Sequence, residues 1–346
     1  MKLHISFDFE KKSGGGSNFL QLLRGEFEAK GVYESQVEKS DVILFNSHHS
    51  CDEIVRLWRK FPEKVFIHRI DGPMQVYNDS FDMRDHIVNL LNFHISDGTI
   101  FQSKWSWETN IERGLVYKKN YTVIHNAPIS KLVSSKGNNR RVQRKIKILI
   151  SSWSSNVNKG FADIKWMDEN LDFSKNEVHF VGNTKDDYVN IKILKAKKHD
   201  EFLKLICEYD LLFFPSKYEA CSNLLLEALN NGLPVIALDS SSNSEILKKG
   251  GELYKTTDEL PEIINKVVNN IDKYRAAIEV QDLKFIAENY YQFCDFVRRL
   301  KKSNKKTFAR KKYFLTIKLK LLHMVHFMMY FLKTKLVRSE IEDSLK

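Results

Sequence analysis

Two carboxylates, Glu219 and Glu227, flank what reads as the start of a helix. They lie in SKYEACSNLLLEALNNGLPVIALD (Ser216–Asp239), with seven residues between them. The apolar run Asp210–Pro215 predicts a buried strand, so Glu219 falls in the loop at the carboxyl end of that strand. The pattern of Leu224–Asn231 predicts a helix, and Glu227 then lies about one turn inside it.

The backbone at this helix start can bind an anion. Free N–H groups and the positive end of the helix dipole gather at Ser222, Asn223 and Leu224. A phosphate there, flanked by two hydroxyl-bearing groups that Glu219 and Glu227 contact, is the outline of a bound nucleotide-sugar. A structural arrangement fits the spacing equally well, with Ser222 or Asn223 capping the helix and Glu227 as a first-turn residue favoured by the dipole.

The elements around this stretch form two blocks of alternating apolar runs and helical patterns, typical of parallel sheets covered by helices. In the first block we expect strands at Lys2–Phe9, Val42–Ser47, Lys64–Ile70, Gly98–Gln102 and Tyr121–His125, and helices at Asn18–Lys30, Asp52–Lys60 and Lys104–Arg113. In the second we expect strands at Lys147–Ser151, Val178–Gly182, Asp210–Pro215 and Pro234–Asp239, and helices at Gly160–Asn170, Asp200–Glu208, Leu224–Asn231 and Ser244–Lys249.

This alternation of predicted strands and helices, in two blocks, divides the chain into domains. We expect a Rossmann-like N-terminal domain (1–133), a polar linker (134–145), a second Rossmann-like domain (146–281), a further helix (282–300), and a basic, apolar tail (301–346). Two such domains usually hold a ligand in the cleft between them, at the carboxyl ends of the strands.

Composition narrows the protein class. The chain has 346 residues and four scattered cysteines without metal or disulfide spacing, which indicates reduced thiols in a cytosolic protein. The first ten residues resemble a strand, with charges where a secretory signal would be apolar. Residues 301–346 hold thirteen Lys and Arg against three Asp and Glu, which leaves them +10 of the net charge of +11. An acidic partner is therefore expected at the tail alone.

The stretch Ser216–Leu247 resembles the signature of family 4 retaining glycosyltransferases. Their pattern is a Glu, seven residues, a second Glu followed by Ala, then Gly-x-Pro-Val-Ile and a downstream Glu, and this chain matches it in order and spacing. The resemblance implies that Glu219 contacts hydroxyls of the donor sugar as a catalytic residue. It also implies that Glu227 binds the ribose hydroxyls, and that Ser222, Asn223 and Leu224 approach the sugar and diphosphate.

A second match, ILISSWSSNVNKGFADIKWMD (Ile148–Asp168), resembles the phosphate-binding Lys-Gly of the family. Lys159 would offset the diphosphate charge and stabilise the leaving nucleotide, which makes it catalytic; the alternative is a surface lysine before a helix. Many members have an arginine where this chain has Trp153, and the Ser-Trp-Ser-x-Asn variant resembles a subgroup. Asn156 can contact phosphate only as a neutral partner.

The first domain carries weaker matches. Gly15 and Gly16, in KKSGGGSNFLQLLRGEFEAKG, follow the first strand and resemble the family's glycine loop, which faces the diphosphate and acceptor. A flexible turn would have the same composition. In SDGTIFQSKWSWE, Ser103 and Lys104 are candidates for contacts to the acceptor or a phosphate; VIHNAP (Val123–Pro128) also resembles a stretch of the family's N-terminal domain.

The His-Arg-Ile-Asp-Gly sequence in VFIHRIDGPMQVY ends a predicted strand, so its side chains are expected to point into the cleft. Here His68 is a catalytic candidate, because either His68 or Asp71 could orient an acceptor hydroxyl or contact the donor sugar. Arg69 could bind a phosphate on a lipid-linked acceptor. The alternative is a solvated histidine beside a structural Arg–Asp pair.

Taken together, the resemblance implies an α/β protein of the GT-B class, with two facing, doubly wound Rossmann-like domains and a basic amphipathic C-terminal helical tail. The first domain (1–133) would lie on the acceptor side and the second (146–281) would bind the nucleotide-sugar, while the helix at 282–300 would pack back toward the first domain. It implies a retaining, metal-independent hexosyltransferase without a cofactor, whose partners are a nucleotide-diphosphate-sugar donor and a glycan or lipid-linked acceptor. We expect a role in cell-surface polysaccharide or lipopolysaccharide biosynthesis. Two alternatives remain: a transferase for a soluble or protein acceptor, and a non-catalytic nucleotide-sugar-binding protein at the membrane.

The tail contains the apolar stretch Tyr313–Leu332, which lysines interrupt and basic clusters flank. This pattern favours a helix in the headgroup plane of an anionic membrane over a membrane span. We therefore expect a cytoplasmic protein, peripheral at the inner face of the cell membrane. A helix packed on the protein's own surface is the alternative. Nucleic acid is not an expected partner, because the apolar run would serve no purpose there.

Overall fold

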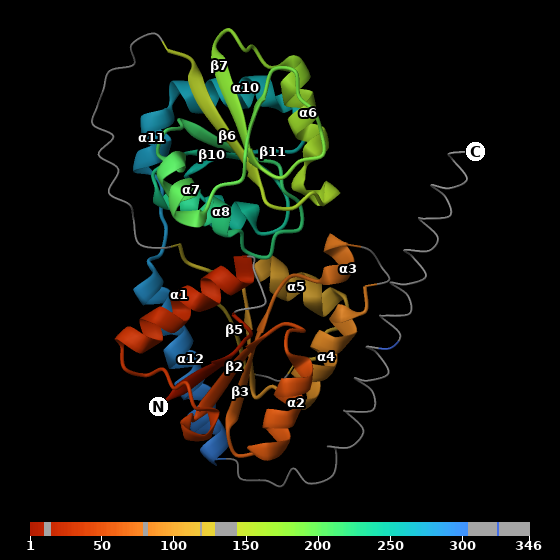
Figure 1. Cartoon of the computed structure of the whole chain (residues 1–346), viewed down its shortest axis with the longest axis vertical. Helices are drawn as coiled ribbons and strands as arrows, with labels where there is room; N and C mark the ends of the chain where they lie inside the picture. The colour runs from red at the N-terminus through yellow and green to blue at the C-terminus, as the bar shows by residue number, and fades with distance from the viewer. Residues whose placement is uncertain (10–14, 79–81, 118–119, 129–143, 304–323, 325–346) are drawn as a thin grey trace, which may run out of the picture. The chain divides into compact units, whose positions relative to one another are not determined.

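A computed structural model describes residues 1–9, 15–78, 82–117, 120–128, 144–303 and 324 (Figure 1). The chain divides into two compact units. Unit 1 consists of Met1–Ile124 together with the chain from Ala287 onward, and unit 2 consists of His125–Ile286. The predicted linker, apart from residues 144 and 145, and the predicted tail beyond Ser303, apart from Met324, lie outside the described residues.

Unit 1 contains a five-stranded parallel sheet of order β1-β2-β3-β4-β5. Its strands are β1 (Leu3–Ser6), β2 (Val42–Asn46), β3 (Val65–Ile70), β4 (Gly98–Phe101) and β5 (Tyr121–Val123). Its helices are α1 (Gly15–Ala29), α2 (Cys51–Lys60), α3 (Met74–Tyr77), α4 (Arg84–His94), α5 (Lys104–Glu112) and, from Ala287 on, α12 (Leu283–Ser303).

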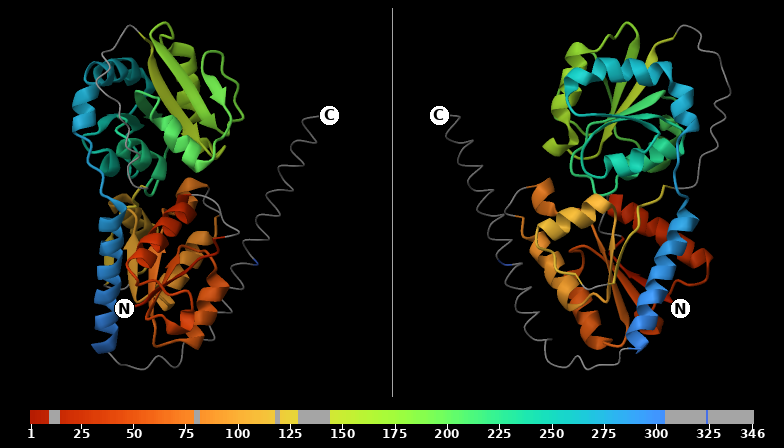
Figure 2. Two further views of the ribbon diagram at one scale, coloured as in Figure 1. Left: turned by 60° about the vertical axis from the view of Figure 1, so that its left-hand side comes forward. Right: turned by 180° about the vertical axis from the view of Figure 1, so that it is seen from behind.

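Both faces of this sheet are covered. On one face, Phe45 of β2 packs in a core cluster with Trp58 of α2 and Leu91 of α4. α12 runs along unit 1 (Figure 2), where the ring of Tyr290 lies 5.8 Å from that of Phe19 on α1, between centroids. Apolar residues at alternate strand positions therefore meet helices on opposite sides, as a doubly wound sheet requires.

Unit 2 contains a six-stranded parallel sheet of order β11-β10-β9-β6-β7-β8. Its strands are β6 (Ile146–Ser152), β7 (Asn176–Gly182), β8 (Lys192–Leu194), β9 (Leu211–Phe214), β10 (Val235–Leu238) and β11 (Gly251–Tyr254). Its helices are α6 (Phe161–Asn170), α7 (His199–Ile206), α8 (Asn223–Asn230), α9 (Asn243–Leu247), α10 (Leu260–Asn269) and α11 (Ile271–Ala276).

Two separate core clusters show how the second sheet is sandwiched. Leu149 of β6 belongs to the cluster that includes α7, α8 and α9, whereas its neighbours Ile148 and Ile150 belong to the cluster that includes α6 and α10. The same alternation divides β9 and β10 between the two clusters. The apolar runs of the sequence are continuous because both faces of these strands are buried.

Every strand and helix expected from the apolar pattern is present, with ends shifted by at most three residues. The pattern missed α3, α4, α10, α11 and two short strands, β8 and β11. β11 begins at Gly251, where an added Cβ would lie only 1.8 Å from the carbonyl oxygen of Val235. Only glycine lets this strand approach its neighbour so closely at its first residue. The strand therefore lacks an apolar side chain there, and apolar side chains are what predict a strand from the sequence.

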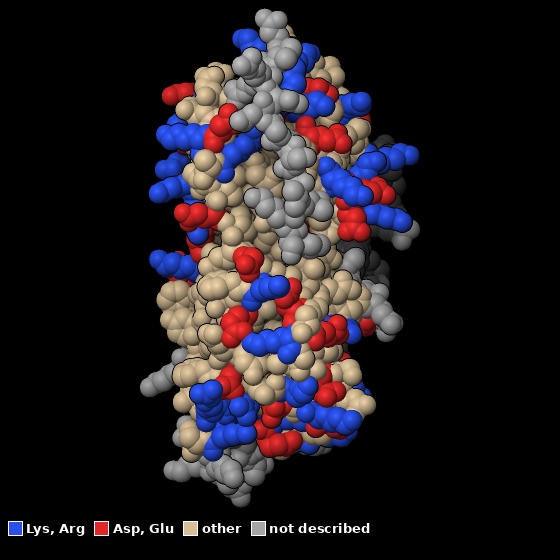
Figure 3. All heavy atoms as spheres, turned by 90° about the vertical axis from the view of Figure 1, so that its left-hand side faces the viewer, with Lys and Arg blue, Asp and Glu red and all other residues tan. Residues whose placement is uncertain are grey.

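The described surface carries both charge signs. On the face that Figure 3 shows, Lys and Arg lie among Asp and Glu over both units. This agrees with the net charge of the chain, of which residues 1–300 hold only +1. Within the described ranges, none of the helices has the length and apolar character that crossing a membrane requires.

Candidate functional site

The two loops that hold the predicted donor residues are packed against each other at the carboxyl edge of the second sheet. Gly160, before α6, has φ +78°, and a Cβ on it would lie 2.4 Å from the carbonyl oxygen of Pro215, after β9. Beside this contact, the backbone N–H of Lys217 donates to the carbonyl of Asn158 at 2.7 Å. Only glycine allows this conformation and this approach together.

This packing brings Lys159 and Glu219 together. Nζ of Lys159 lies 2.6 Å from Oε1 of Glu219, and both side chains are largely buried. The backbone of Glu219 is held by the loop after β10, because its N–H donates to Ser241 Oγ at 3.0 Å and its carbonyl accepts from Ser242 Oγ at 2.9 Å. The preceding residue, Tyr218, has φ +57°, a strained value for a residue other than glycine.

Helix α8 starts directly after this loop. Ser222 is its N-cap: its Oγ accepts from the N–H of Leu225 at 3.4 Å, and its carbonyl accepts from Leu226 at 3.2 Å. The capping role that the sequence left open therefore falls to Ser222. The N–H of Leu224 has no hydrogen-bond partner among the described residues, so it is one of the donors that a helix start offers to an anion.

Glu227 is a buried acid. It is 8% exposed, and its Oε1 lies 2.8 Å from Nε2 of His199 at the start of α7. This hydrogen bond raises the pKa of His199. A dipole-favoured surface residue would need no such partner, so a carboxylate held in this way is a candidate ligand-binding group.

The loop after β6 contains Trp153 and Asn156, which have different surroundings. Trp153 is about half exposed, with its ring edge-on to Phe202 of α7 at 5.8 Å between centroids. Its carbonyl accepts from Asn183 Nδ2 at 3.0 Å. Oδ1 of Asn156 accepts from the N–H of Asn158 at 2.9 Å and so caps the turn that leads to Lys159. Asn156 thus shapes this loop from within.

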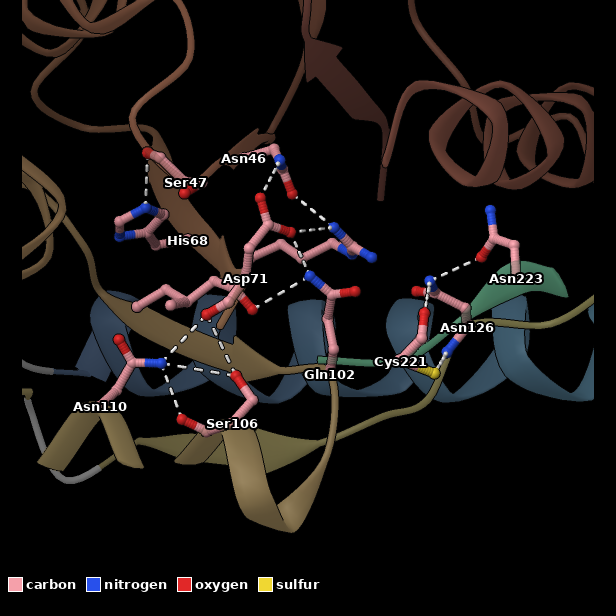
Figure 4. Close-up of polar contacts among 12 residues, drawn as sticks. Asn46, Ser47, His68, Asp71, Gln102, Ser106, Asn110, Asn126, Cys221 and Asn223 are labelled. Carbon is pink, nitrogen blue, oxygen red and sulfur yellow. Dashed lines mark hydrogen bonds and ion pairs between the residues drawn. The ribbon is translucent and has the colours of Figure 1, made fainter. Parts of the chain in front are cut away.

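The segment His125–Pro128 belongs to unit 2 and bonds to this edge of the sheet. The backbone N–H of Asn126 donates to Cys221 Sγ at 3.2 Å, while its Nδ2 donates to the Cys221 carbonyl at 3.1 Å and to Asn223 Oδ1 at 2.9 Å (Figure 4). Sequence reasoning missed Asn126, because no spacing rule connects residues about a hundred positions apart.

In unit 1 the hydrogen bonds converge on Asp71, at the carboxyl end of β3 (Figure 4). Its carboxylate accepts from Asn46 Nδ2 at 3.2 Å, from Arg69 Nη1 at 3.2 Å and from Gln102 Nε2. The three donors come from the ends of β2, β3 and β4. A carboxylate bound by three donors keeps one orientation and remains a hydrogen-bond acceptor.

Arg69 is placed otherwise than expected. It is fully buried: Nε donates to the hydroxyl of Tyr290 at 3.1 Å, Nη1 donates to Asn46 Oδ1 at 2.5 Å, and the guanidinium lies 5.0 Å from the centroid of the Phe19 ring. With no exposed surface, it does not present itself to a phosphate on an acceptor. Its pairing with Asp71 matches the structural alternative that the sequence left open.

His68 is also enclosed. Its ring is fully buried, stacks on Phe45 at 4.3 Å between centroids, and contacts the Ser47 carbonyl through Nε2 at 2.9 Å and Asn92 Oδ1 through Nδ1 at 3.3 Å. Burial lowers the pKa of His68 to about 4, so the ring is neutral near pH 7. Strand residues alternate between faces, and this one points into the core and away from any ligand. Asp71, whose side chain keeps some exposed surface, is therefore the candidate for contacting an acceptor, and His68 is not.

The remaining predicted site residues lie at or near the starts of helices α1 and α5. Gly15 and Gly16 are the first residues of α1 and do not form a loop before it. Ser103 is fully buried and caps α5, where its Oγ accepts from the N–H of Ser106 at 3.0 Å. Lys104 is exposed on the same helix. Over the described ranges, no three His, Cys, Asp or Glu side chains are placed to hold a metal ion.

Comparison with known proteins gives a family match for part of the chain and similar folds for most of it. Residues 174–281, a little under a third of the chain, match the profile of the family described as glycosyl transferases group 1. A comparison with curated proteins gives no match. Among solved structures, the chain is similar to sucrose-phosphate synthase from Thermosynechococcus elongatus, with TM-score 0.65, 13% identity, and coverage of 87% of this chain and 99% of that one.

Two further solved structures are similar. HepE from Anabaena in complex with UDP has TM-score 0.64 and 17% identity, with 86% of this chain and 100% of that chain covered. WaaG, a glycosyltransferase involved in lipopolysaccharide biosynthesis, has TM-score 0.61 and 13% identity, with 86% and 99% covered. At these identities the likeness establishes the fold, and it confirms the predicted α/β class with two GT-B-type units.

Proposed function

We propose that this protein is a retaining glycosyltransferase that moves a sugar from a nucleotide-diphosphate-sugar to a hydroxyl of a glycan or lipid-linked acceptor. The observation that carries the proposal is the cluster of Lys159, Glu219 and Glu227 around the start of α8. It combines a cation, two carboxylates and a helix N-terminus, which are the groups that a sugar diphosphate needs. The match of residues 174–281 to glycosyl transferases group 1 covers the two carboxylates.

Each group has a role toward the donor. The carboxylate of Glu227 accepts hydrogen bonds from the ribose hydroxyls, and the helix start at Ser222–Leu224 receives the diphosphate. Lys159 offsets the phosphate charge, while Glu219 orients the sugar through its hydroxyls. Without donor, Lys159 and Glu219 neutralise each other at 2.6 Å. A donor supplies new partners for both, so neither charge is left unpaired when it binds.

The reaction follows from these positions. An acceptor hydroxyl attacks the anomeric carbon on the face that the diphosphate leaves, so the bond to the acceptor oxygen forms as the bond to the phosphate oxygen breaks. The acceptor proton passes to the departing diphosphate, and the configuration at the anomeric carbon is retained. Lys159 and the N–H groups of α8 stabilise the charge that develops on the leaving group. Since these groups bind the diphosphate, the proposed reaction is metal-independent.

Unit 1 provides the acceptor side. The carboxylate of Asp71, which Asn46, Arg69 and Gln102 hold in place, accepts a hydrogen bond from the acceptor hydroxyl and orients it. Arg69 takes part only by fixing Asp71, because it is fully buried. An envelope glycan is the acceptor class we favour. WaaG is involved in lipopolysaccharide biosynthesis, and the basic tail (301–346) would bring the protein to the inner face of the membrane.

One observation favours a second candidate, a non-catalytic nucleotide-sugar-binding protein. Trp153 stands where many family 4 enzymes have an arginine, and it offers no charge to the diphosphate. If Lys159 alone cannot stabilise the leaving group, the chain would bind donors without cleaving them. Binding without release separates this candidate from the transferase.

The test is nucleotide release from a panel of common nucleotide-sugars, with and without membrane extract as a source of acceptor. The wild type is expected to release nucleotide from at least one donor. Lys159→Ala and Glu219→Ala are expected to lower the rate by a factor on the order of 100, whereas Lys175→Ala, which removes an exposed lysine of unit 2, leaves it unchanged. Binding without release would support the second candidate. A wild type that neither binds nor releases any donor would refute both.

A further inference from the structure

Asn126 is held in one orientation by an acceptor that cannot change its role. The carbonyl of Cys221 lies 3.1 Å from Nδ2 of Asn126, and a backbone carbonyl can only accept. The amide nitrogen of Asn126 must therefore face Cys221, and its oxygen must face the other way. The site is also closed, because Asn126 is 4% exposed and Cys221 is 7% exposed. The amide thus has little room to rotate.

This orientation determines that of Asn223. The same Nδ2 of Asn126 lies 2.9 Å from the Asn223 side chain, so Asn223 has to present its oxygen there. Its own Nδ2 then points away from Asn126, as Figure 4 shows.

The end that Asn223 turns outward matters to an anion. Asn223 is the first residue of α8, next to the N–H of Leu224, which has no hydrogen-bond partner in the part of the chain that the structure describes. An amide nitrogen there adds a donor to those of the helix start, whereas an amide oxygen would repel a phosphate. We infer that Asn126 is a positioning residue for the donor diphosphate: it turns Asn223 so that an N–H donor, and not an oxygen, faces the phosphate oxygens. This inference rests on the proposed function.

The sharpest variant is Asn126→Asp, which keeps the size of the side chain and replaces the donor with an oxygen. The new carboxylate could bond to Asn223 only if the Asn223 amide turned over, and this would point the Asn223 oxygen at the ligand. We expect the affinity for a nucleoside diphosphate to fall about 10- to 100-fold, the effect of losing a hydrogen bond to a charged group. Calorimetric titration with UDP, GDP and ADP measures it, and the tightest of the three serves for all variants.

Testing Asn126→Asp in a second variant, Asn223→Ala, separates the loss of Asn223 positioning from the effect of the negative charge that the aspartate adds. In Asn223→Ala there is no amide left to turn, so adding Asn126→Asp should change the affinity less than about twofold. If the loss persists at full size there, it arises from the charge of the aspartate, and the inference is overturned. The matched control, for the general effect of changing a buried asparagine to aspartate, is Asn176→Asp. Asn176 is also buried and donates through Nδ2 to a backbone carbonyl, that of Asp172, at 2.9 Å, but it begins β7 at the opposite end of the strand.

The remaining outcomes are also decisive. Should Asn126→Asp fail to fold, Asn223→Asp tests the same geometry at a partly exposed position: it still accepts from Asn126 but turns a second oxygen toward the ligand, so it should lose affinity to the same extent. Unchanged affinity in either variant overturns the inference and leaves the proposed function intact. A wild type that binds none of the three nucleotides would overturn both.

Discussion

Gly160→Ala perturbs the donor site through backbone geometry alone. Gly160 lies where the turn before α6 meets the loop after β9, with φ +78°. An alanine there would place its Cβ 2.4 Å from the carbonyl oxygen of Pro215 and 2.5 Å from its Cβ. The contacting atoms of Pro215 are its backbone carbonyl and the Cβ of its rigid ring, and neither can move aside as a flexible side chain would. The turn that carries Lys159 must therefore shift.

The size of the effect can be worked out. A left-handed conformation costs an L-residue about 1–2 kcal/mol. Relieving the contact needs a displacement of roughly 1 Å, since carbon atoms pack best at about 3.5–4.0 Å. This shift breaks the 2.7 Å bond from Lys217 to Asn158, which costs about 1 kcal/mol more. We expect the free energy of unfolding to fall by about 2–3 kcal/mol in total.

Activity should suffer more than stability. Lys159 precedes Gly160 directly, so a shift of this size moves its ammonium away from both Glu219 and the diphosphate. A displacement of about 1 Å can lower a rate about 100-fold. The assays are urea unfolding, and nucleotide release from the best donor at a temperature where the variant remains folded.

Gly232→Ala is the matched control. Gly232 follows α8 with φ +72°, nearly the same conformation, but an added Cβ meets nothing within 4 Å. This variant should lose only the about 1–2 kcal/mol of the left-handed conformation and keep its activity. The difference between the two variants isolates the contact with Pro215. Equal losses of stability, or full activity in Gly160→Ala, would refute the reasoning.

Three further predictions concern buried and paired charges. Because burial lowers the pKa of His68 to about 4 from an ordinary 6.5, stability should fall as the pH drops from about 6.5 toward 4, and the unfolding free energy of His68→Gln should depend less on pH over this range. Arg69→Met removes the cation that pairs with Asp71 and should cost about 3–5 kcal/mol in urea unfolding. Tyr290→Phe removes the hydroxyl that accepts from Arg69 Nε and should cost about 1 kcal/mol. Since the contact with Glu227 raises the pKa of His199, its stabilisation is complete below the ordinary pKa of histidine and is lost as the pH rises through the raised value; a pH series of unfolding should show this loss in the wild type and not in His199→Gln.

Local patterns predicted much of this molecule. Strands such as β6 and β9 are buried on both faces, so their apolar runs stand out in the sequence, and the glycine after α8 marks where that helix ends. The spacing of Glu219 and Glu227 pointed to the start of α8, where both are found. These features are readable because residues close in the chain produce them.

In the first unit, local patterns did not predict which side chains are buried. His68 and Arg69 end a strand in the predicted way, yet both are fully buried, while Asp71 keeps some exposed surface. The direction of a side chain depends on which face of the sheet is covered and by what. For Arg69 the covering residue is Tyr290, more than two hundred positions away on α12. No pattern around position 69 contains that information.

By itself, the sequence determined the α/β class, most strands and helices, and the residues around the start of α8, because apolar periodicity, glycines and motif spacing are local. Only the tertiary structure decided that Lys159 pairs with Glu219, that Glu227 is buried against His199, and that Asn126 orients Asn223. The first two contacts join segments that follow different strands of the second sheet, and the third joins α8 to a segment about a hundred residues earlier in the chain. Parallel strands bring their carboxyl ends to one edge of the sheet, so groups far apart in the chain meet there once the sheet has formed.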